Sequence, residues 1–94
     1  MTTTQVTTEF TGALSNDLFR VVSLQQRGSI KAAERFLGEA QRWTKPLLQQ
    51  NVKKYIATIV QEIDTASHKD LSVEKIERYL MYAVLLQNYT LHTK

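Results

Sequence analysis

Few residues of this chain combine a reactive side chain with the spacing that catalysis or metal binding requires. His68 and His92 are the only imidazoles, and they lie far apart without the His-Glu-x-x-His spacing that places two ligands on one helix face. Asp64 lies four residues before His68, a spacing typical of a local ion pair on a helix. No nucleophile accompanies this pair, and the chain contains no Cys. The sequence therefore predicts no enzyme activity, no metal site and no cofactor.

The acidic pairs and the glycines are typical of structural roles. Glu74 and Glu77 fall in the first turn of a predicted helix, where the helix dipole favours carboxylates. Gly12, Gly28 and Gly38 are dispersed along the chain, so they lack the spacing of a loop that binds nucleotide phosphates. Neither feature indicates catalysis.

Positive charge is concentrated in the middle of the chain. The formal net charge is only +3, but the segment from Arg20 to Lys54 holds eight basic residues and two acidic ones. Such a segment either binds phosphates or forms the solvated surface of helices, and the sequence leaves both interpretations open. The candidate nucleic-acid contacts are Arg35, Gln41, Arg42, Lys45, Lys53 and Lys54.

Residues 28–38 (GSIKAAERFLG) resemble the first helix and turn of the DNA-binding domain of LysR-type regulators. The resemblance implies a helix-turn-helix whose recognition helix begins near Gln41. The chain departs from the family at Pro46, which would fall inside that helix, remove a hydrogen bond and clash with the preceding turn. The groove contacts that the resemblance implies are Gln41, Arg42 and Lys45, with Lys53 and Lys54 near the phosphates.

An unbroken apolar and aromatic run extends from Tyr79 to Leu86 inside a helical pattern. A helix that is apolar around its circumference is either enclosed by its own bundle or lies in an interface with a partner, and both remain open. In one arrangement the inward-facing residues are Ile76, Leu80, Ala83 and Val84. The second apolar face is then the candidate interface, which consists of Met81, Tyr82, Leu85 and Tyr89.

Four amphipathic helices are predicted to position these residues, from about Phe10 to the stop at Gly28, and over 30–44, 46–66 and 73–89. Pro46 is expected to begin the third helix, because proline fits a first turn and disfavours a helical residue before it. Gly38 indicates either a break in the second helix or close packing of another backbone against it.

Local patterns predict several contacts of these helices. Ser29 and Ser72 are expected N-caps, and Leu71 is expected to pack on Ile76 as a hydrophobic staple. Trp43 is expected to pack against the core, where its indole N–H needs a partner. Arg35 and Glu39 are four residues apart and are expected to pair weakly on the surface.

Short links between amphipathic helices favour antiparallel neighbours, so the predicted fold is all-α, a small up-and-down bundle of about four helices. The threonine-rich segment 1–8 is predicted to be a flexible tail, and residues 9–94 a single helical domain. No apolar stretch approaches the roughly 18 residues of a membrane span, and the N-terminus lacks the pattern of a signal peptide. These features predict a soluble, cytoplasmic protein.

The hypothesis with the most support is a small protein-protein interaction or regulatory module. In this hypothesis the C-terminal helix pairs with the same helix of a second copy to form a homodimer, or it binds a helix of another protein. The alternative is a nucleic-acid-binding protein that uses residues 20–54. The salt dependence of binding separates the two, because phosphate contacts weaken steeply as salt rises whereas an apolar interface does not.

Overall fold

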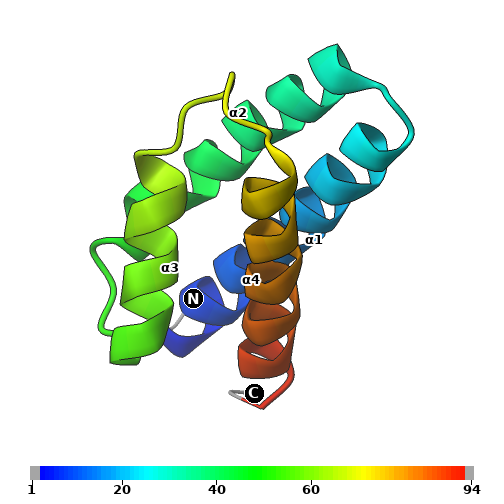
Figure 1. Ribbon diagram of the computed structural model, residues 1–94. Coiled ribbons are helices and arrows are strands. Elements are labelled where there is room, and N and C mark those ends of the chain that lie inside the picture. The colour runs from blue at the N-terminus through cyan, green and yellow to red at the C-terminus, as the bar shows by residue number, and fades with distance from the viewer. Residues whose placement is uncertain (1–2, 93–94) are drawn as a thin grey trace.

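The computed structural model describes residues 3–92, with side chains from Val6 onward, and these residues form four helices (Figure 1). This confirms the predicted small all-α bundle. The helices are α1 (Thr3–Gln26), α2 (Ile30–Leu47), α3 (Lys54–Asp64) and α4 (Val73–His92).

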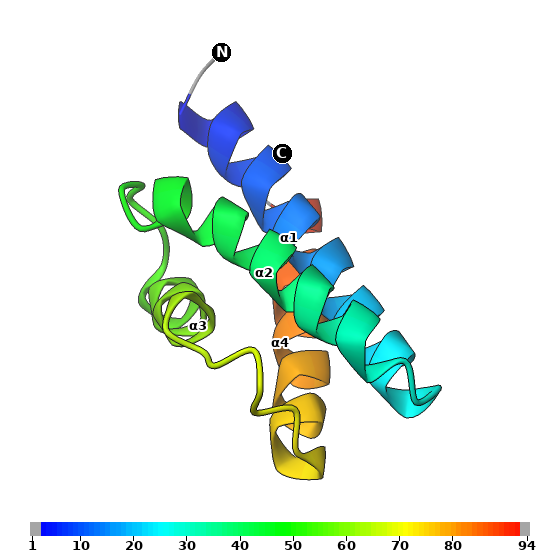
Figure 2. The same cartoon turned by 90° about the horizontal axis from the view of Figure 1, so that it is seen from above.

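Helix α1 is the centre of the bundle, because it packs extensively against both α2 and α4. Helix α3 packs mainly against α2, and its backbone approaches α4 only weakly. Figure 2 shows the consequence: α3 and α4 lie on the same side of the α1–α2 pair, with α4 at the edge of the bundle. One side of α4 therefore has none of the other three described helices against it.

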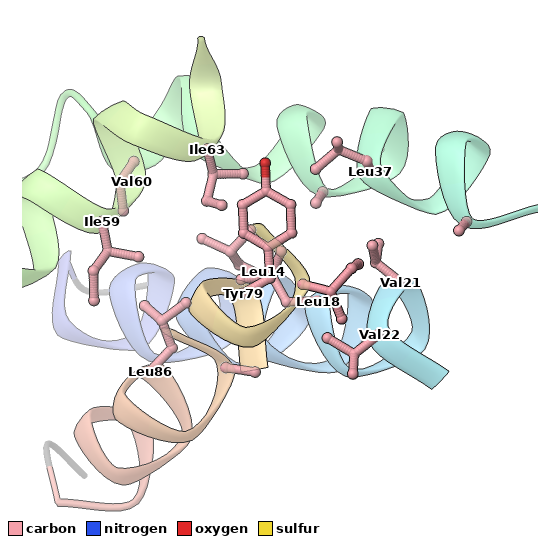
Figure 3. Close-up of a cluster of buried hydrophobic side chains, with 14 of the residues drawn as sticks. Leu14, Leu18, Val21, Val22, Leu37, Ile59, Val60, Ile63, Tyr79 and Leu86 are labelled. Carbon is pink, nitrogen blue, oxygen red and sulfur yellow. The ribbon is translucent and has the colours of Figure 1, made fainter. Parts of the chain in front are cut away.

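The core is formed by aliphatic side chains from all four helices and by one tyrosine (Figure 3). Tyr79 is 1% exposed and is the largest of the fully buried side chains. The apolar residues that recur at helical spacing in α2 and α3 are mostly buried, among them Ala33, Leu37, Ala40, Ile56, Ile59 and Ile63. Ile30 and Leu48 were expected in the same stripes but are 43% and 44% exposed. Leu14, Leu18, Val21 and Val22 supply the contribution of α1.

The predicted start of the first helix near Phe10 is wrong, because α1 begins at Thr3. Thr7, Thr11 and Ser15 are buried, and Ser15 Oγ donates a hydrogen bond of 2.7 Å to the carbonyl oxygen of Ala83 in α4. Packing against α4 thus outweighs the poor helix propensity of threonine. The predicted tail 1–8 is helical from Thr3 onward, and residues 1 and 2 lie outside the described residues.

The turns after α1 and before α4 follow the predicted local signals. Gly28 adopts a positive φ of 80°, and the N–H groups of Gly28 and Ser29 donate to the carbonyls of Gln25 and Leu24 in a Schellman motif. Ser72 Oγ accepts a hydrogen bond from the N–H of Lys75, which confirms the cap of α4. Ser29, by contrast, makes no side-chain capping bond.

The predicted helix boundary before Pro46 is also wrong, because α2 continues through Pro46 to Leu47. The N–H of Leu48 donates to the carbonyl of Thr44 at 2.9 Å, so the proline removes only its own donor in the last turn. Leu47 is 1% exposed, and its burial stabilises this turn. Residues 48–53 form a connection, and α3 begins only at Lys54.

Gly38 does not interrupt α2, so the predicted break is absent. The segment that lies against Gly38 is a side chain, the ring of His68, and not another backbone as expected. A Cβ atom added to Gly38 would lie 3.3 Å from Cε1 of His68, a tight contact with the loop after α3. Within residues 3–92, no helix has the length and apolar character needed to cross a membrane.

Candidate interaction surface

Helix α4 has a buried face and an apolar face that stays exposed. Ile76, Tyr79, Ala83 and Leu86 point into the core. On the other side of the helix lies what we call the outer face of α4. Its apolar residues and their exposed fractions are Val73 (69%), Leu80 (40%), Met81 (54%), Val84 (41%), Leu85 (36%) and Leu91 (56%).

The structure divides the four predicted interface residues between two environments. Met81 and Leu85 lie on the outer face, as predicted. Tyr82 and Tyr89 are partly buried and pack against the core. The Tyr89 ring meets Tyr55 of α3 edge-on, with ring centroids 6.4 Å apart. The two tyrosines therefore help to join α3 to α4.

The proposed inward packing of Leu80 and Val84 is wrong, because both side chains are exposed. A helix can bury only the side that faces its neighbours, and α4 has α1 as its main neighbour. Ser15 and Ala83 bring the two backbones close on that side, and Tyr79 fills the space toward α2 and α3. Leu80 and Val84 lie on the side of α4 that faces away from these neighbours, so their side chains stay exposed.

Two charged residues border the outer face on the side of α3. Arg78 Nη1 lies 3.5 Å from Glu62 Oε2, so an ion pair links α4 to α3. Burial raises the pKa of Tyr82, and the neighbouring Glu62 raises it further. These groups hold α3 beside α4 without covering the outer face.

The outer face has a heptad spacing. Residues 73, 77, 80, 84, 87 and 91 follow one another at intervals of four, three, four, three and four. Such a row lies along one side of a helix, in the pattern of a coiled-coil seam. It holds four apolar residues and two polar ones, Glu77 and Gln87, both exposed. The sequence carried this signal, but the aromatic residues on the opposite side obscured it.

The predicted nucleic-acid contacts do not form one free basic surface. Gln41 Nε2 donates to the carbonyls of Ile63 (3.0 Å) and Ala66 (2.9 Å), at the C-terminal end of α3. Arg42 pairs with Glu39 at 3.2 Å, whereas Glu39 was expected to pair with Arg35. Of the six predicted contacts, three are exposed and have no such role: Arg35, in the middle of α2, and Lys53 and Lys54, before and at the start of α3.

The local geometry of a helix-turn-helix is absent from residues 28–54, because α2 is continuous through the position of the expected turn. Gln41, the first residue implied to contact a groove, instead binds α3 and the His68 ring. Nucleic-acid binding by the basic segment stays a prediction without support from this arrangement.

A shallow hollow of about 530 Å³ lies between α1 and α2. Trp43 Nε1 donates to Asp17 Oδ2 at 2.9 Å, which supplies the expected indole partner, and the Trp43 ring packs on Phe10. Burial raises the pKa of Asp17, while the hydrogen bond from Trp43 lowers it. The hollow combines carboxylates with Arg35 and holds no nucleophile. Among residues 3–92, no group of three or more His, Asp or Glu side chains could hold a metal ion.

Asp64 forms the most connected polar cluster between α2 and α3. Its Oδ1 accepts hydrogen bonds from Lys45 Nζ and Thr44 Oγ1, both at 2.8 Å, and these bonds lower its pKa. The predicted contact of Asp64 with His68 is wrong, because His68 Nε2 lies 2.6 Å from Gln41 Oε1. Since that oxygen can only accept, His68 Nε2 carries the proton.

A pH-dependent loss of stability is expected from this cluster. A carboxylate whose pKa is lowered in the folded state stabilises the fold above its unfolded pKa, and this contribution disappears as the pH falls through the folded value. Asp64→Asn should therefore lower the free energy of unfolding by up to about 1 kcal/mol at pH 7, because Lys45 is largely exposed. The difference between variant and parent should shrink as the pH falls below about 4, the unfolded pKa of an aspartate, measured by urea unfolding monitored by circular dichroism.

Glu39→Gln is the matched control for this prediction, because its pair with Arg42 is exposed on one helix. It should change the free energy of unfolding little at any pH. An Asp64→Asn variant that loses the same stability at pH 2 and pH 7 would contradict the linkage. The pKa of Asp17 is raised in the folded state, so its contribution to the free energy of unfolding changes with pH in the opposite direction to that of Asp64. The effect of Asp64 is therefore read from the difference between the variant and the parent at each pH, and not from the parent alone.

Comparison of this chain with protein-family models, with curated proteins and with solved structures finds no match.

Proposed function

We propose that this chain is a self-associating helical interaction module and that the outer face of α4 is its contact surface. The observation that carries the proposal is the row of exposed apolar side chains at heptad spacing on α4. Proteins that act alone seldom expose a contiguous apolar patch of more than a few hundred Å². Covering such a patch with a matching one removes apolar surface from water and stabilises the assembly.

A helical partner fits this surface better than a loop or a flat sheet. The apolar residues follow a line along a helix of 20 residues, which is about 30 Å long. A second helix with the same spacing could insert its side chains between them along the whole row. Two such faces together would bury on the order of 1,000 Å², about the smallest area of a specific interface.

Replacing both Leu80 and Val84 by Glu is expected to abolish self-association. The two residues lie at the middle of the row, and a pair of carboxylates cannot be desolvated there without a partner charge. Both side chains are exposed, so the bundle itself should remain folded. Sedimentation velocity from about 1 to 300 μM should show a monomer-dimer equilibrium for the parent chain and only monomer for the variant, with equal helical content by circular dichroism.

The matched control is Ile30→Glu combined with Leu48→Glu, because these residues are as exposed as Leu80 and Val84 but lie on α2 and just after it. This variant should associate as the parent does. A parent chain that stays monomeric at the highest concentration would overturn the proposal. A control variant that also becomes monomeric would place the interface elsewhere.

A further inference from the structure

We infer that two copies of α4 pair antiparallel, in a register centred near residue 82. This inference rests on the proposed function and goes further, because it fixes the partner, its direction and the residues that meet. In this register Leu80 packs on Val84 of the second copy, and Val73 packs on Leu91 of the second copy. Glu77 lies opposite Gln87 of the second copy.

The symmetry of the row carries the inference. In antiparallel helix pairs, each a position of one helix meets a d position of the other. In the order 73, 77, 80, 84, 87 and 91, the first residue faces the last, the second faces the fifth, and the third faces the fourth. Every apolar residue then meets an apolar residue, and each polar residue meets a polar one. A two-fold axis relates the two copies, as in most homodimers.

The polar pair is complementary only in this direction. The amide of Gln87 can donate a hydrogen bond to the carboxylate of Glu77 across the antiparallel pair. A parallel pair in register would instead place Glu77 against Glu77 in the seam, where two like charges repel. The antiparallel arrangement also brings helix ends of opposite partial charge together. Charge and hydrogen bonding therefore select the antiparallel direction.

The structure leaves room for this partner. No helix lies on the viewer's side of α4 in Figure 1, whereas α1 lies behind it. Met81 is exposed beside the row and close to its centre, so it would lie near the two-fold axis. Leu85 lies further round the helix and would form the rim of the contact. The seam itself consists of Val73, Leu80, Val84 and Leu91 with Glu77 and Gln87.

Cysteine cross-linking tests the direction, and the natural absence of Cys makes each introduced thiol unique. In the antiparallel pair, Val73→Cys and Leu91→Cys come together only between copies. Within one straight helix the two positions are about 27 Å apart, too far for a disulfide. Under an oxidising glutathione buffer, the V73C/L91C double variant should form a covalent dimer on a non-reducing gel. Each single variant should stay uncross-linked, because its two thiols lie at opposite ends of the dimer.

Covalent dimers of each single variant would overturn the antiparallel register, since a parallel pair places identical positions side by side. A double variant that associates by sedimentation but does not cross-link would overturn the register while leaving self-association intact. A double variant that is monomeric by sedimentation, like the parent, would overturn the proposed function itself. The three outcomes are therefore distinguishable. Thr58→Cys, exposed on α3, is the control for random collisions and should not cross-link.

A charge substitution gives a second, independent measurement. Gln87→Lys should tighten the dimer about threefold to tenfold, because each of the two symmetric layers gains an ion pair with Glu77. Gln87→Glu should weaken it by a similar factor, since it places a second carboxylate opposite Glu77. In a parallel pair both substitutions would weaken the dimer, because each would face its own copy. If the dissociation constant falls neither for Gln87→Lys nor for Gln87→Glu, the antiparallel register is overturned.

Discussion

Replacing Tyr79 by alanine is expected to lower the free energy of unfolding by about 3–5 kcal/mol, the range for removing a large buried aromatic side chain. Tyr79 is 1% exposed and projects from α4 toward α2 and α3 (Figure 3). Its removal leaves a cavity among aliphatic side chains of three other helices, and a close-packed core collapses only partly into such a space. A domain of this size has about 5–15 kcal/mol to lose, so the variant should be only marginally folded.

Leu80→Ala is the matched control, because Leu80 is the next residue on the same helix but is 40% exposed. At a concentration low enough to keep the chain monomeric, it should cost less than about 1 kcal/mol. Thermal and urea unfolding of the two variants, followed by circular dichroism, makes the comparison. Equal losses for Tyr79→Ala and Leu80→Ala would mean that α4 is oriented differently in the bundle.

Replacing Gln41 by leucine is expected to lower the free energy of unfolding by about 1–3 kcal/mol. The Gln41 amide donates to the carbonyls of Ile63 and Ala66 and accepts from His68, so it caps the C-terminal end of α3 and holds the following loop. Leucine preserves the volume and removes every one of these bonds. The loss should be concentrated in α3, where amide hydrogen exchange should accelerate more than in α1.

Arg42→Leu is the control for this second prediction, since Arg42 is exposed beside Gln41 and pairs only with Glu39 in the same helix. It should cost less than about 0.5 kcal/mol. Gln41→Glu is a sharper variant, because it keeps the shape but turns a carboxylate toward the carbonyl oxygens of α3. It should be at least as destabilising as Gln41→Leu at pH 7. Full stability of both Gln41 variants would contradict the capping role.

Gln41 shows why the predicted nucleic-acid contacts could not be evaluated from the sequence. A polar residue on the outside of a helical pattern has the same appearance in the sequence whether it meets solvent, a ligand or another helix. Its contacts here join α2 to residues 63–68, more than twenty positions away. Local spacing contains no information about such long-range bonds.

Pro46 and the threonines of α1 show the limits of local propensity. Proline fits a first turn but loses a hydrogen bond in a last turn, so local preference placed the helix boundary before Pro46. Burial of Leu47 extends α2 past the proline, and burial of Thr7 and Thr11 extends α1 toward the N-terminus. In each case the free energy of packing exceeded a local preference of a fraction of a kcal/mol to a few kcal/mol.

The sequence by itself determined the all-α class, the four helices, the turn at Gly28, the cap at Ser72 and most of the buried residues of α2 and α3. These features follow from helical periodicity and from short-range hydrogen bonds, which involve residues only a few positions apart. Only the tertiary structure decided which side of α4 is buried. Tyr79 and Leu80 are neighbours in one apolar and aromatic run of the sequence, but α1 packs against only one side of the helix. The other side keeps its apolar heptad row exposed, because residues 3–92 form no further helix that covers it.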